Sequence, residues 1–540
     1  MNFKELGKKK LSTVSEAISQ TPDEFLGSWI KKYFKGYEKD ALRILVTSAV
    51  TCLLCYFYHM IYAYGCPDAL SEGVYYYRNT EWAAKLARWM VKYINLVIGR
   101  NVVIPVIIFP VYCLLIGYAC FLLCRMFNIR QVLSQVLLTA VMVSFPVVLH
   151  HFCYPYIAVS YAFAFLMAVV GTKLIWEHKI AGFILGIIAF LMMLGTYQTY
   201  IGAVSALAFI ALVYDMLTKE KILKSLFSLL KVGLAGIVAG LIDIPFSGFM
   251  ARLTGVGLIS RVDVSFDSII ENFGFSRHFA YAWFFSFFTS DDFLSRNKIY
   301  PLLLIVLAII IIAVAVNLII AKKIGQAAVL IVSVLFLPAA MNIFLFIFPS
   351  EGIRDIMRYQ YVLGFVLIFF LLEQESKRIY NILLRYVTYI CLAVLVAGNV
   401  ITANSTAFLH KIMYEYTVKQ GEIMVSRLYE LDEYERNETP VIMTGPVDVS
   451  HLIARYPMIF KYAESEGGPV FWGGYVGMGS SRYHFFYDYL GMDFKEYPES
   501  EYIRITDSEE FKEMPVWPKE GSVAMIDGYA VIKMGEEPVR

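Results

Sequence analysis

Two carboxylates lie close to the end of the first long apolar run of the chain. Asp68 and Glu72 are four residues apart, and the apolar run before them ends near residue 64. A carboxylate can accept the proton of an attacking hydroxyl group, which accelerates a reaction roughly a hundred- to ten-thousand-fold. The spacing therefore predicts a general base at a membrane surface, with Asp68 as the base and Glu72 as its helper.

A group of cations follows these carboxylates along the chain. Asn79 and Thr80 are typical of a helix start, and a rotation of 100° per residue places Lys85, Arg88 and Lys92 on one face of that helix. Another face holds the large apolar side chains Trp82, Leu86, Trp89, Met90 and Tyr93. We expect a helix flat on the membrane that presents Lys85 and Arg88 to a phosphate. The alternative is an anchoring helix with solvated cations.

Two arginines stand at the approach to the tenth apolar stretch. Arg354 and Arg358 are four residues apart and would share one face of a helix. Two guanidinium groups on one face could clamp a phosphate through paired hydrogen bonds. The alternative is two ordinary ion pairs, Arg354 with Glu351 and Arg358 with Asp355.

Five further side chains are candidates for binding sugar. Tyr197 and Gln198 follow the fifth apolar stretch and could hydrogen-bond to hydroxyl groups, with an aromatic belt as the alternative. Asp291 and Asp292 are candidates for an acceptor or metal site, or for a helix N-cap. Trp472 could stack on a sugar ring or pack in a core. The sequence identifies no cofactor and no cluster of metal ligands. A role for a divalent metal is left open.

The elements that must position these residues are membrane helices. The chain has 540 residues, of which 58% are hydrophobic and 17% charged, and its mean hydropathy is +0.60. A soluble protein carries about 25% charged residues. The composition therefore predicts an integral membrane protein, and the lack of a strongly basic domain excludes a nucleic-acid partner.

Apolar stretches define the predicted fold class, an all-α polytopic membrane protein. A membrane helix needs about 20 apolar residues to cross about 30 Å of hydrocarbon. Eleven stretches meet this description: 41–64, 102–124, 132–149, 155–176, 180–196, 201–217, 226–245, 300–320, 325–348, 358–373 and 382–403. Only residues 196–200 separate the fifth from the sixth, so one long kinked helix is the alternative there.

The distribution of lysine and arginine predicts the orientation. One set of connections holds twelve of them: Arg125, Arg130, Lys173, Lys179, Lys219, Lys221, Lys224, Lys322, Lys323, Lys377, Arg378 and Arg385. The opposite short loops hold two, Arg354 and Arg358. Because cytoplasmic loops are enriched in these residues, the N-terminus is expected in the cytoplasm and the C-terminal region outside the plasma membrane.

Charge also divides the chain into segments. Residues before 404 hold 34 Lys and Arg against 22 Asp and Glu, whereas residues 404–540 hold 13 against 23. We expect a cytoplasmic amphipathic segment over 1–40, a transmembrane catalytic domain over 41–403 with long outer loops at 65–101 and 246–300, and a soluble domain over 404–540. Strand-like runs in this last segment, PVIMTG, GPVFWGGYVG and SVAMIDGYAVIKM, predict a small α/β domain.

The chain resembles a polytopic glucosyltransferase-domain family that includes serotype-converting O-antigen glucosyltransferases. The resemblance lies in PDALSEGVYYYRNTEWAAKLARW, TYQTYIG, HKIMYEYTVKQGEIMVSRLYELDEY and MPVWPKEGSVAMIDGYAVIKM. It implies a C-superfamily glycosyltransferase fold with an acidic residue in the first outer loop, matched by Asp68 and Glu72. It also implies a Trp and a Gly-Arg step, matched by Trp82 and by Ala87-Arg88, where alanine replaces the expected glycine.

The predicted function is a membrane glycosyltransferase on the outer face. It would move one sugar, glucose or a related hexose, from an undecaprenyl-phosphate carrier to a cell-surface polysaccharide, as the resemblance implies. Its expected partners are the lipid-linked sugar, the polysaccharide acceptor and membrane lipids. A polysaccharide polymerase or ligase is the closest alternative. A lipid-linked glycan flippase is a third, disfavoured by the few mid-span charges and the lack of an internal repeat.

Overall fold

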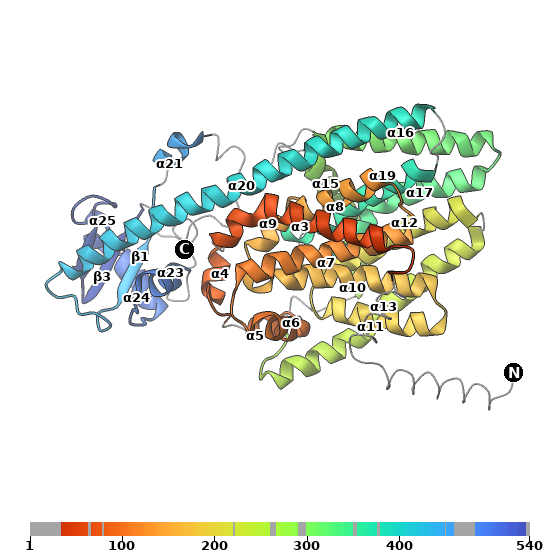
Figure 1. The fold of residues 1–540 in the computed structure, drawn as a ribbon. Coiled ribbons are helices and arrows are strands. Elements are labelled where there is room, and N and C mark those ends of the chain that lie inside the picture. Colours follow the sequence, from red (N-terminus) through yellow and green to blue (C-terminus); the bar gives the residue numbers. More distant parts are fainter. Residues whose placement is uncertain are drawn as a thin grey trace, which may run out of the picture.

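The structure of the chain is a computed structural model. It describes residues 34–62, 66–77, 80–219, 222–259, 266–289, 299–348, 354–374, 379–445, 447–448, 450–457 and 481–535. Within these residues a bundle of apolar helices is followed by a small domain with a sheet (Figure 1). Most of the predicted amphipathic segment 1–40 lies outside the described residues.

Eight helices among the described residues are long and apolar enough to cross a membrane. They are α3 (Glu38–Ile61), α7 (Pro105–Met126), α10 (Ala158–Glu177) with the turn η1 (Pro155–Ile157), α12 (Ile201–Lys219) with the turn η2 (Gln198–Tyr200), α13 (Ile222–Leu253), α16 (Ile299–Ile320), α17 (Ile324–Met341) and α20 (Ile379–Tyr429). Three shorter apolar helices are α8 (Val132–Ser144), α11 (Ile180–Leu194) and α19 (Leu363–Gln374), the last preceded by the turn η6 (Tyr359–Val362). Each predicted stretch overlaps a helix, while eleven crossings stay a prediction.

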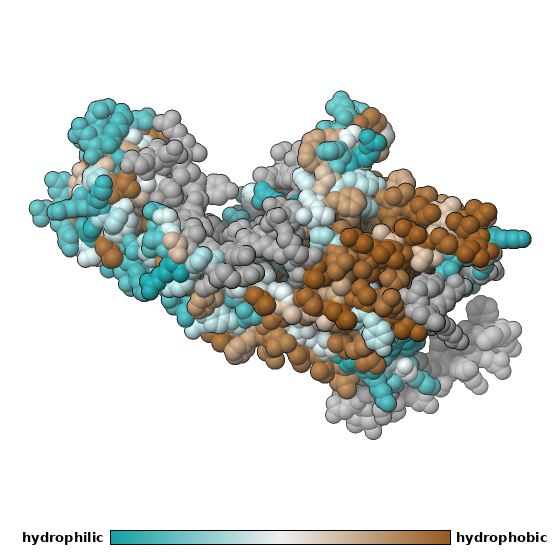
Figure 2. Space-filling model, turned by 90° about the horizontal axis from the view of Figure 1, so that it is seen from above, coloured by the Kyte–Doolittle hydropathy of each residue, from teal (hydrophilic) through white to brown (hydrophobic). Residues whose placement is uncertain are grey.

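The face of the bundle seen in Figure 2 carries a large apolar area, drawn in brown. On α16, Ile305, Ile309 and Ile312 are exposed at 57%, 45% and 61%, whereas Val306 and Ile310 are buried. A helix that is apolar on its exposed face as well as on its buried face is typical of a lipid environment. The chain is therefore a membrane protein.

Glycines allow two of these helices to approach closely. A Cβ atom on Gly186 of α11 would lie 2.3 Å from Cγ1 of Ile175, and one on Gly171 of α10 would lie 2.5 Å from the ring of Phe190. Small residues at such contacts let helix backbones pack together in a membrane. The pair α10 and α11 thus forms a rigid support for the turn that follows α11.

Two predicted boundaries can be compared with the observed helices. The fifth and sixth stretches are separate, because α11 ends at Leu194 and α12 starts at Ile201 after the turn η2. The helix that contains the seventh stretch is longer than the predicted stretch, since α13 continues beyond residue 245 to Leu253. The expected loop 246–300 then contains α14 (Phe266–Glu271) and α15 (Phe273–Thr289), and the aromatic run AYAWFFSFF lies on α15.

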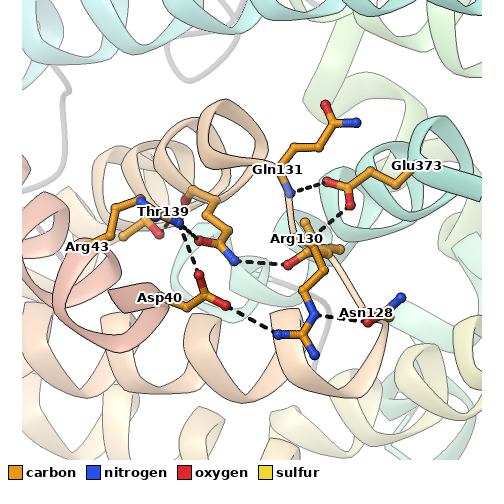
Figure 3. Close-up of polar contacts among 9 residues, drawn as sticks. Asp40, Arg43, Asn128, Arg130, Gln131, Thr139 and Glu373 are labelled. Atoms are coloured by element: carbon orange, nitrogen blue, oxygen red, sulfur yellow. Dashed lines mark hydrogen bonds and ion pairs between the residues drawn. The ribbon is translucent and has the colours of Figure 1, made fainter. Parts of the chain in front are cut away.

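A polar network joins α3, α8 and α19 at the end of α3 that is distant from α4 (Figure 3). Asp40 accepts hydrogen bonds from Arg43 at 3.1 Å and from Arg130 at 3.4 Å, and Arg43 also binds Gln135. The carboxylate of Glu373 accepts the backbone N–H groups of Arg130 at 2.7 Å and Gln131 at 3.2 Å. Glu373 thus satisfies two backbone donors that lie immediately before α8.

The region after the bundle begins inside one continuous helix. α20 has 51 residues and is about 77 Å long, so the predicted boundary at residue 404 lies within it. It leads to a three-stranded sheet in the order β1 (Val441–Thr444), β3 (Tyr529–Lys533), β2 (Val523–Ile526), with β1 parallel and β2 antiparallel to β3. Asp527 and Gly528 have φ of +46° and +79° and form the β2–β3 turn.

Short helices accompany the sheet in this C-terminal domain. They are α21 (Ser450–Arg455), α23 (Ser481–Leu490), α24 (Glu499–Thr506) and α25 (Glu509–Glu513). The strands predicted in PVIMTG and SVAMIDGYAVIKM are confirmed as β1, β2 and β3. The run GPVFWGGYVG lies outside the described residues.

Candidate active site

A cavity of about 450 Å³ lies at the end of the bundle where α3 is followed by α4 (Pro67–Glu72). Segments that are far apart in the sequence form its wall, and they belong to the region around α4, the connection after α5 (Thr80–Lys85), the turns η1 and η2, and the turn η5 (Asp355–Met357). Its lining includes most of the residues singled out in the sequence: Asp68, Glu72, Trp82, Arg88, Tyr197, Gln198 and Arg354. The structure therefore brings carboxylates and arginines into one cavity.

The carboxylates belong to one face of α4. Asp68, Ser71 and Glu72 line the cavity, as the spacings of three and four residues require on a helix. Asp68 is exposed to solvent, whereas Glu72 is only 9% exposed. Gly73 has a φ of +109° and ends the helix after Glu72.

An aromatic wall stands next to these carboxylates. The rings of Tyr77 and Tyr156 are stacked with centroids 5.0 Å apart, and both line the cavity. Burial raises the pKa of Tyr77, the nearby carboxylate of Glu72 raises it further, and the guanidinium of Arg88 lowers it. Glu72 and Arg88 therefore both act on the same neutral phenol. Flat aromatic rings can pack against the apolar faces of a sugar.

The single helix predicted after Asn79 is wrong, because the chain turns between α5 and α6 (Trp89–Gly99), while its flat orientation on the membrane stays a prediction. Ala87 adopts a φ of +60°, which interrupts the helix. The side-chain amide of Gln198 donates a hydrogen bond to the carbonyl of Leu86 at 2.9 Å, and this distant contact holds the turn. Arg88 lines the cavity, whereas Lys85 is not among its lining residues, so the two predicted phosphate ligands are separated.

The first residues of α6 are fixed to the bundle. Trp89 Nε1 donates a hydrogen bond to Asp243 Oδ1 at 3.2 Å, and the hydroxyl of Ser247 donates to the same oxygen. The N–H of Met90 donates to the carbonyl of Gly195 at 2.7 Å, and a Cβ on Gly195 would lie 2.1 Å from Trp89 Cε2. Asp243 was not among the residues predicted from the sequence. Its signal was a lone carboxylate inside an apolar run.

Arg88 lies over an aromatic platform. Its guanidinium carbon is 4.8 Å from the centroid of Tyr197, a ring that is 1% exposed. Tyr161 meets Tyr197 edge to face at 4.8 Å and supports it from the side. A cation over an aromatic face is attracted by the ring, so the platform orients Arg88. Sugar binding by Tyr197 and Gln198 stays a prediction.

The two arginines before α19 do not share a helical face, so that prediction is wrong. Arg354 has an extended backbone with φ −82° and ψ 162°, and the turn η5 follows it. Arg358 forms an ion pair with Asp355 at 2.8 Å, as the alternative prediction had it, whereas Arg354 lines the cavity. Of this pair, Arg354 is the candidate phosphate ligand.

A buried histidine holds the turn that carries Arg354. His151 lies on α9 (Val147–Phe152); its Nε2 is 3.0 Å from the carbonyl oxygen of Ile356, and its Nδ1 is 2.7 Å from the hydroxyl of Tyr112. Because a carbonyl only accepts, Nε2 donates to Ile356 and Nδ1 accepts from Tyr112. His151 was not among the residues predicted from the sequence, although two adjacent histidines at the end of an apolar stretch were a visible signal.

The remaining predicted site residues fall elsewhere. Lys85 is half-buried, and its carbonyl accepts the N–H of Ile259. Asp291, Asp292 and Trp472 lie outside the described residues. In the part of the chain that the structure describes, no group of three or more His, Cys, Asp or Glu side chains could hold a metal ion.

The fold and cavity define a helical membrane protein with a cavity that combines carboxylates with arginines. Such a site suits transfer from a phosphate-bearing substrate, because a carboxylate can take a proton and guanidinium groups stabilise the phosphate. The chain belongs to the GtrII glucosyl transferase family, whose model matches residues 71–372, more than half of the chain. It is therefore a membrane glucosyltransferase. No curated protein and no solved structure matches it.

Proposed function

We propose that this glucosyltransferase moves a single glucose or related hexose from an undecaprenyl-phosphate carrier to a cell-surface polysaccharide on the outer face of the plasma membrane. The observation that carries the proposal is the cavity that Asp68, Glu72, Arg88 and Arg354 line together. Reaction at the anomeric carbon of a sugar phosphate needs a base for the acceptor and cations for the departing phosphate.

The proposed reaction uses these groups in one displacement. The acceptor hydroxyl oxygen bonds to the anomeric carbon, and the bond from that carbon to the phosphate oxygen breaks. Asp68 takes the hydroxyl proton, with Glu72 beside it on the same face of α4. The phosphate leaves with the bonding electron pair, and Arg88 and Arg354 stabilise its charge. The products are a glycoside and the polyprenyl phosphate.

The cavity also has an apolar part that suits a lipid donor. Phe344, Phe348, Ile356 and Met357 belong to its lining, and Phe344 lies on α18 (Phe344–Ile347) directly after the membrane helix α17. A prenyl chain is held in hydrocarbon while its phosphate stays at the interface. Aromatic rings such as Tyr77 and Tyr156 offer flat surfaces for the sugar.

The proposal is tested with purified protein in lipid nanodiscs, polyprenyl-phosphate glucose as donor and the surface polysaccharide as acceptor. Mass spectrometry should show the acceptor enlarged by one hexose and the donor converted to polyprenyl phosphate. Lys92→Gln is a matched control for Arg88→Gln, since Lys92 is exposed on α6 and is not among the cavity residues. Addition of many sugars per acceptor would instead support a polymerase, and failure to consume the lipid donor would reject the proposal.

A further inference from the structure

The helix α4 is too short to hold its own position. It has six residues, and isolated helices shorter than about 12–15 residues are marginal in water. Cys66 at its N-cap makes no side-chain capping hydrogen bond. The packing of its side faces must therefore fix the direction in which Asp68 and Glu72 point.

Each side of α4 has a different neighbour. Asp68, Ser71 and Glu72 line the cavity. Ala69 is 1% exposed and packs with Cys66 and with Cys153 of the bundle. Leu70 is 0% exposed, and its side chain belongs to the hydrophobic core of the C-terminal domain. One residue of α4 thus enters a core that is built almost entirely by residues beyond 410.

The contact between α4 and the C-terminal domain is formed mainly by α23, which packs in turn against α20. Figure 1 shows α4 between the helical bundle and α23. The core that encloses Leu70 includes Tyr414, Met424, Phe485 and Phe486, all 1% exposed or less. Just beyond α4, the rings of Tyr75 and Tyr489 lie with centroids 6.3 Å apart.

The domain itself is tied to the bundle through α20. The amide of Asn404 on this helix donates a hydrogen bond to the carbonyl of Leu54 on α3 at 2.9 Å. The same helix contributes Tyr414 and Met424 to the core around Leu70. Movement of α4 is therefore restrained by the bundle at Ala69 and by the domain at Leu70.

We infer that the C-terminal domain is a positioning element of the transferase, and that Leu70 is the residue through which it orients Asp68 and Glu72. The inference rests on the proposed function, because it assigns the domain a part in that reaction. The family match ends at residue 372, so this domain lies outside it. The domain contacts α4, the helix that carries the proposed base. Arg88 and Arg354 of the proposed phosphate site lie on other segments.

The test measures donor KM and kcat separately for purified Leu70→Ala. A misplacement of about 1 Å can cost roughly 100-fold in rate, so kcat should fall 10- to 100-fold while donor KM stays within about threefold. Leu70→Met should restore most of the loss, because methionine fills a similar volume. Ile503→Ala is the matched control, since Ile503 is 51% exposed on α24 of the same domain, and its kcat should equal that of wild type.

A second variant approaches the contact from the domain. Tyr489→Ala removes the ring beside Tyr75 from a half-buried position, and kcat should fall at least about threefold. If Leu70→Ala does not accumulate in the membrane, the kcat of Tyr489→Ala tests the inference on its own. Wild-type kcat in both variants, or a raised donor KM with unchanged kcat, would overturn the inference. Asp68→Asn separates the two proposals, because its full activity would reject the proposed function itself.

Discussion

At the scale of single residues, the two carboxylates of α4 differ in exposure. Asp68 is open to solvent and can meet an acceptor that arrives from water, whereas Glu72 is 9% exposed and lies close to Tyr77. A general base must reach the hydroxyl proton directly. This difference favours Asp68 as the base and Glu72 as a group that orders the cavity.

The first prediction is that Asp68→Asn lowers turnover about 100-fold or more, because asparagine keeps the shape and removes the basicity. Glu72→Gln should cost less. Single-turnover measurements with polyprenyl-phosphate glucose check both values at equal amounts of protein in the membrane. Asp267→Asn, at an exposed carboxylate of α14, is the control. If the Asp68→Asn variant turned over as fast as wild type and the Glu72→Gln variant were inactive, Glu72 would be the base instead.

The second prediction concerns the arginines. Arg354→Gln and Arg88→Gln should each raise donor KM about tenfold or more, because each removes a charge-assisted hydrogen bond to phosphate. Arg358→Gln should have a smaller effect, since Arg358 is already paired with Asp355. Lysine at Arg354 should restore only part of the affinity, because it lacks the planar fork of guanidinium.

Titration of donor binding to the purified variants checks this order. Lys92→Gln serves as the control for loss of a cation near Arg88, since Lys92 is exposed on α6. An Arg358→Gln variant that binds donor more weakly than Arg354→Gln would show that Arg358 leaves Asp355 to hold the phosphate.

At the scale of elements, the turn between α5 and α6 places Arg88 in the cavity. Ala87, at its centre, has a φ of +60° and is 2% exposed. A non-glycine residue in this conformation costs about 1–2 kcal/mol. The resemblance implies glycine at this position, and the positive φ gives that expectation a physical reason.

The third prediction follows from this conformation. Ala87→Gly should leave the free energy of unfolding within about 1 kcal/mol, because relief of strain offsets the greater flexibility of the unfolded chain. Ala87→Val should destabilise by about 1–3 kcal/mol and lower turnover, since a β-branched residue fits a positive φ poorly. Thermal unfolding in detergent checks the order. Ala181→Val, at an exposed position of α11, is the control. Equal stability of all three variants would contradict the strain argument.

Much of the fold follows from the sequence because an apolar stretch is a local signal. The same is true of the place of Asp68 and Glu72 in the cavity wall, because both directly follow such a stretch. Contacts between distant segments leave no local signal. The break before Arg88 depends on Gln198, and the turn after Arg354 depends on a hydrogen bond from His151. Both were therefore missed.

At the scale of the whole molecule, the cavity limits how the chain crosses the membrane. Segments that line one cavity lie on one side, so an even number of crossings separates any two of them. Between α4 and Tyr154 lie α7 and α8; between Tyr154 and Tyr197 lie α10 and α11. Between Arg354 and the C-terminal domain, which contacts α4, lie α19 and α20. In each pair one helix is long enough to cross, which predicts that the shorter helix crosses too.

The fourth prediction is therefore eleven crossings, with the N-terminus in the cytoplasm and the C-terminal domain outside. Helix α8 would cover only about 20 Å of the about 30 Å of hydrocarbon, and local thinning of the bilayer accommodates such short helices. Reporters that are active on one side only should place fusions after Lys179 and after Lys323 in the cytoplasm and a fusion after Arg540 outside. If only the eight long helices crossed, the readings after Lys179 and Arg540 would both be reversed. That result would separate α4 from the C-terminal domain and would also reject the role proposed for Leu70.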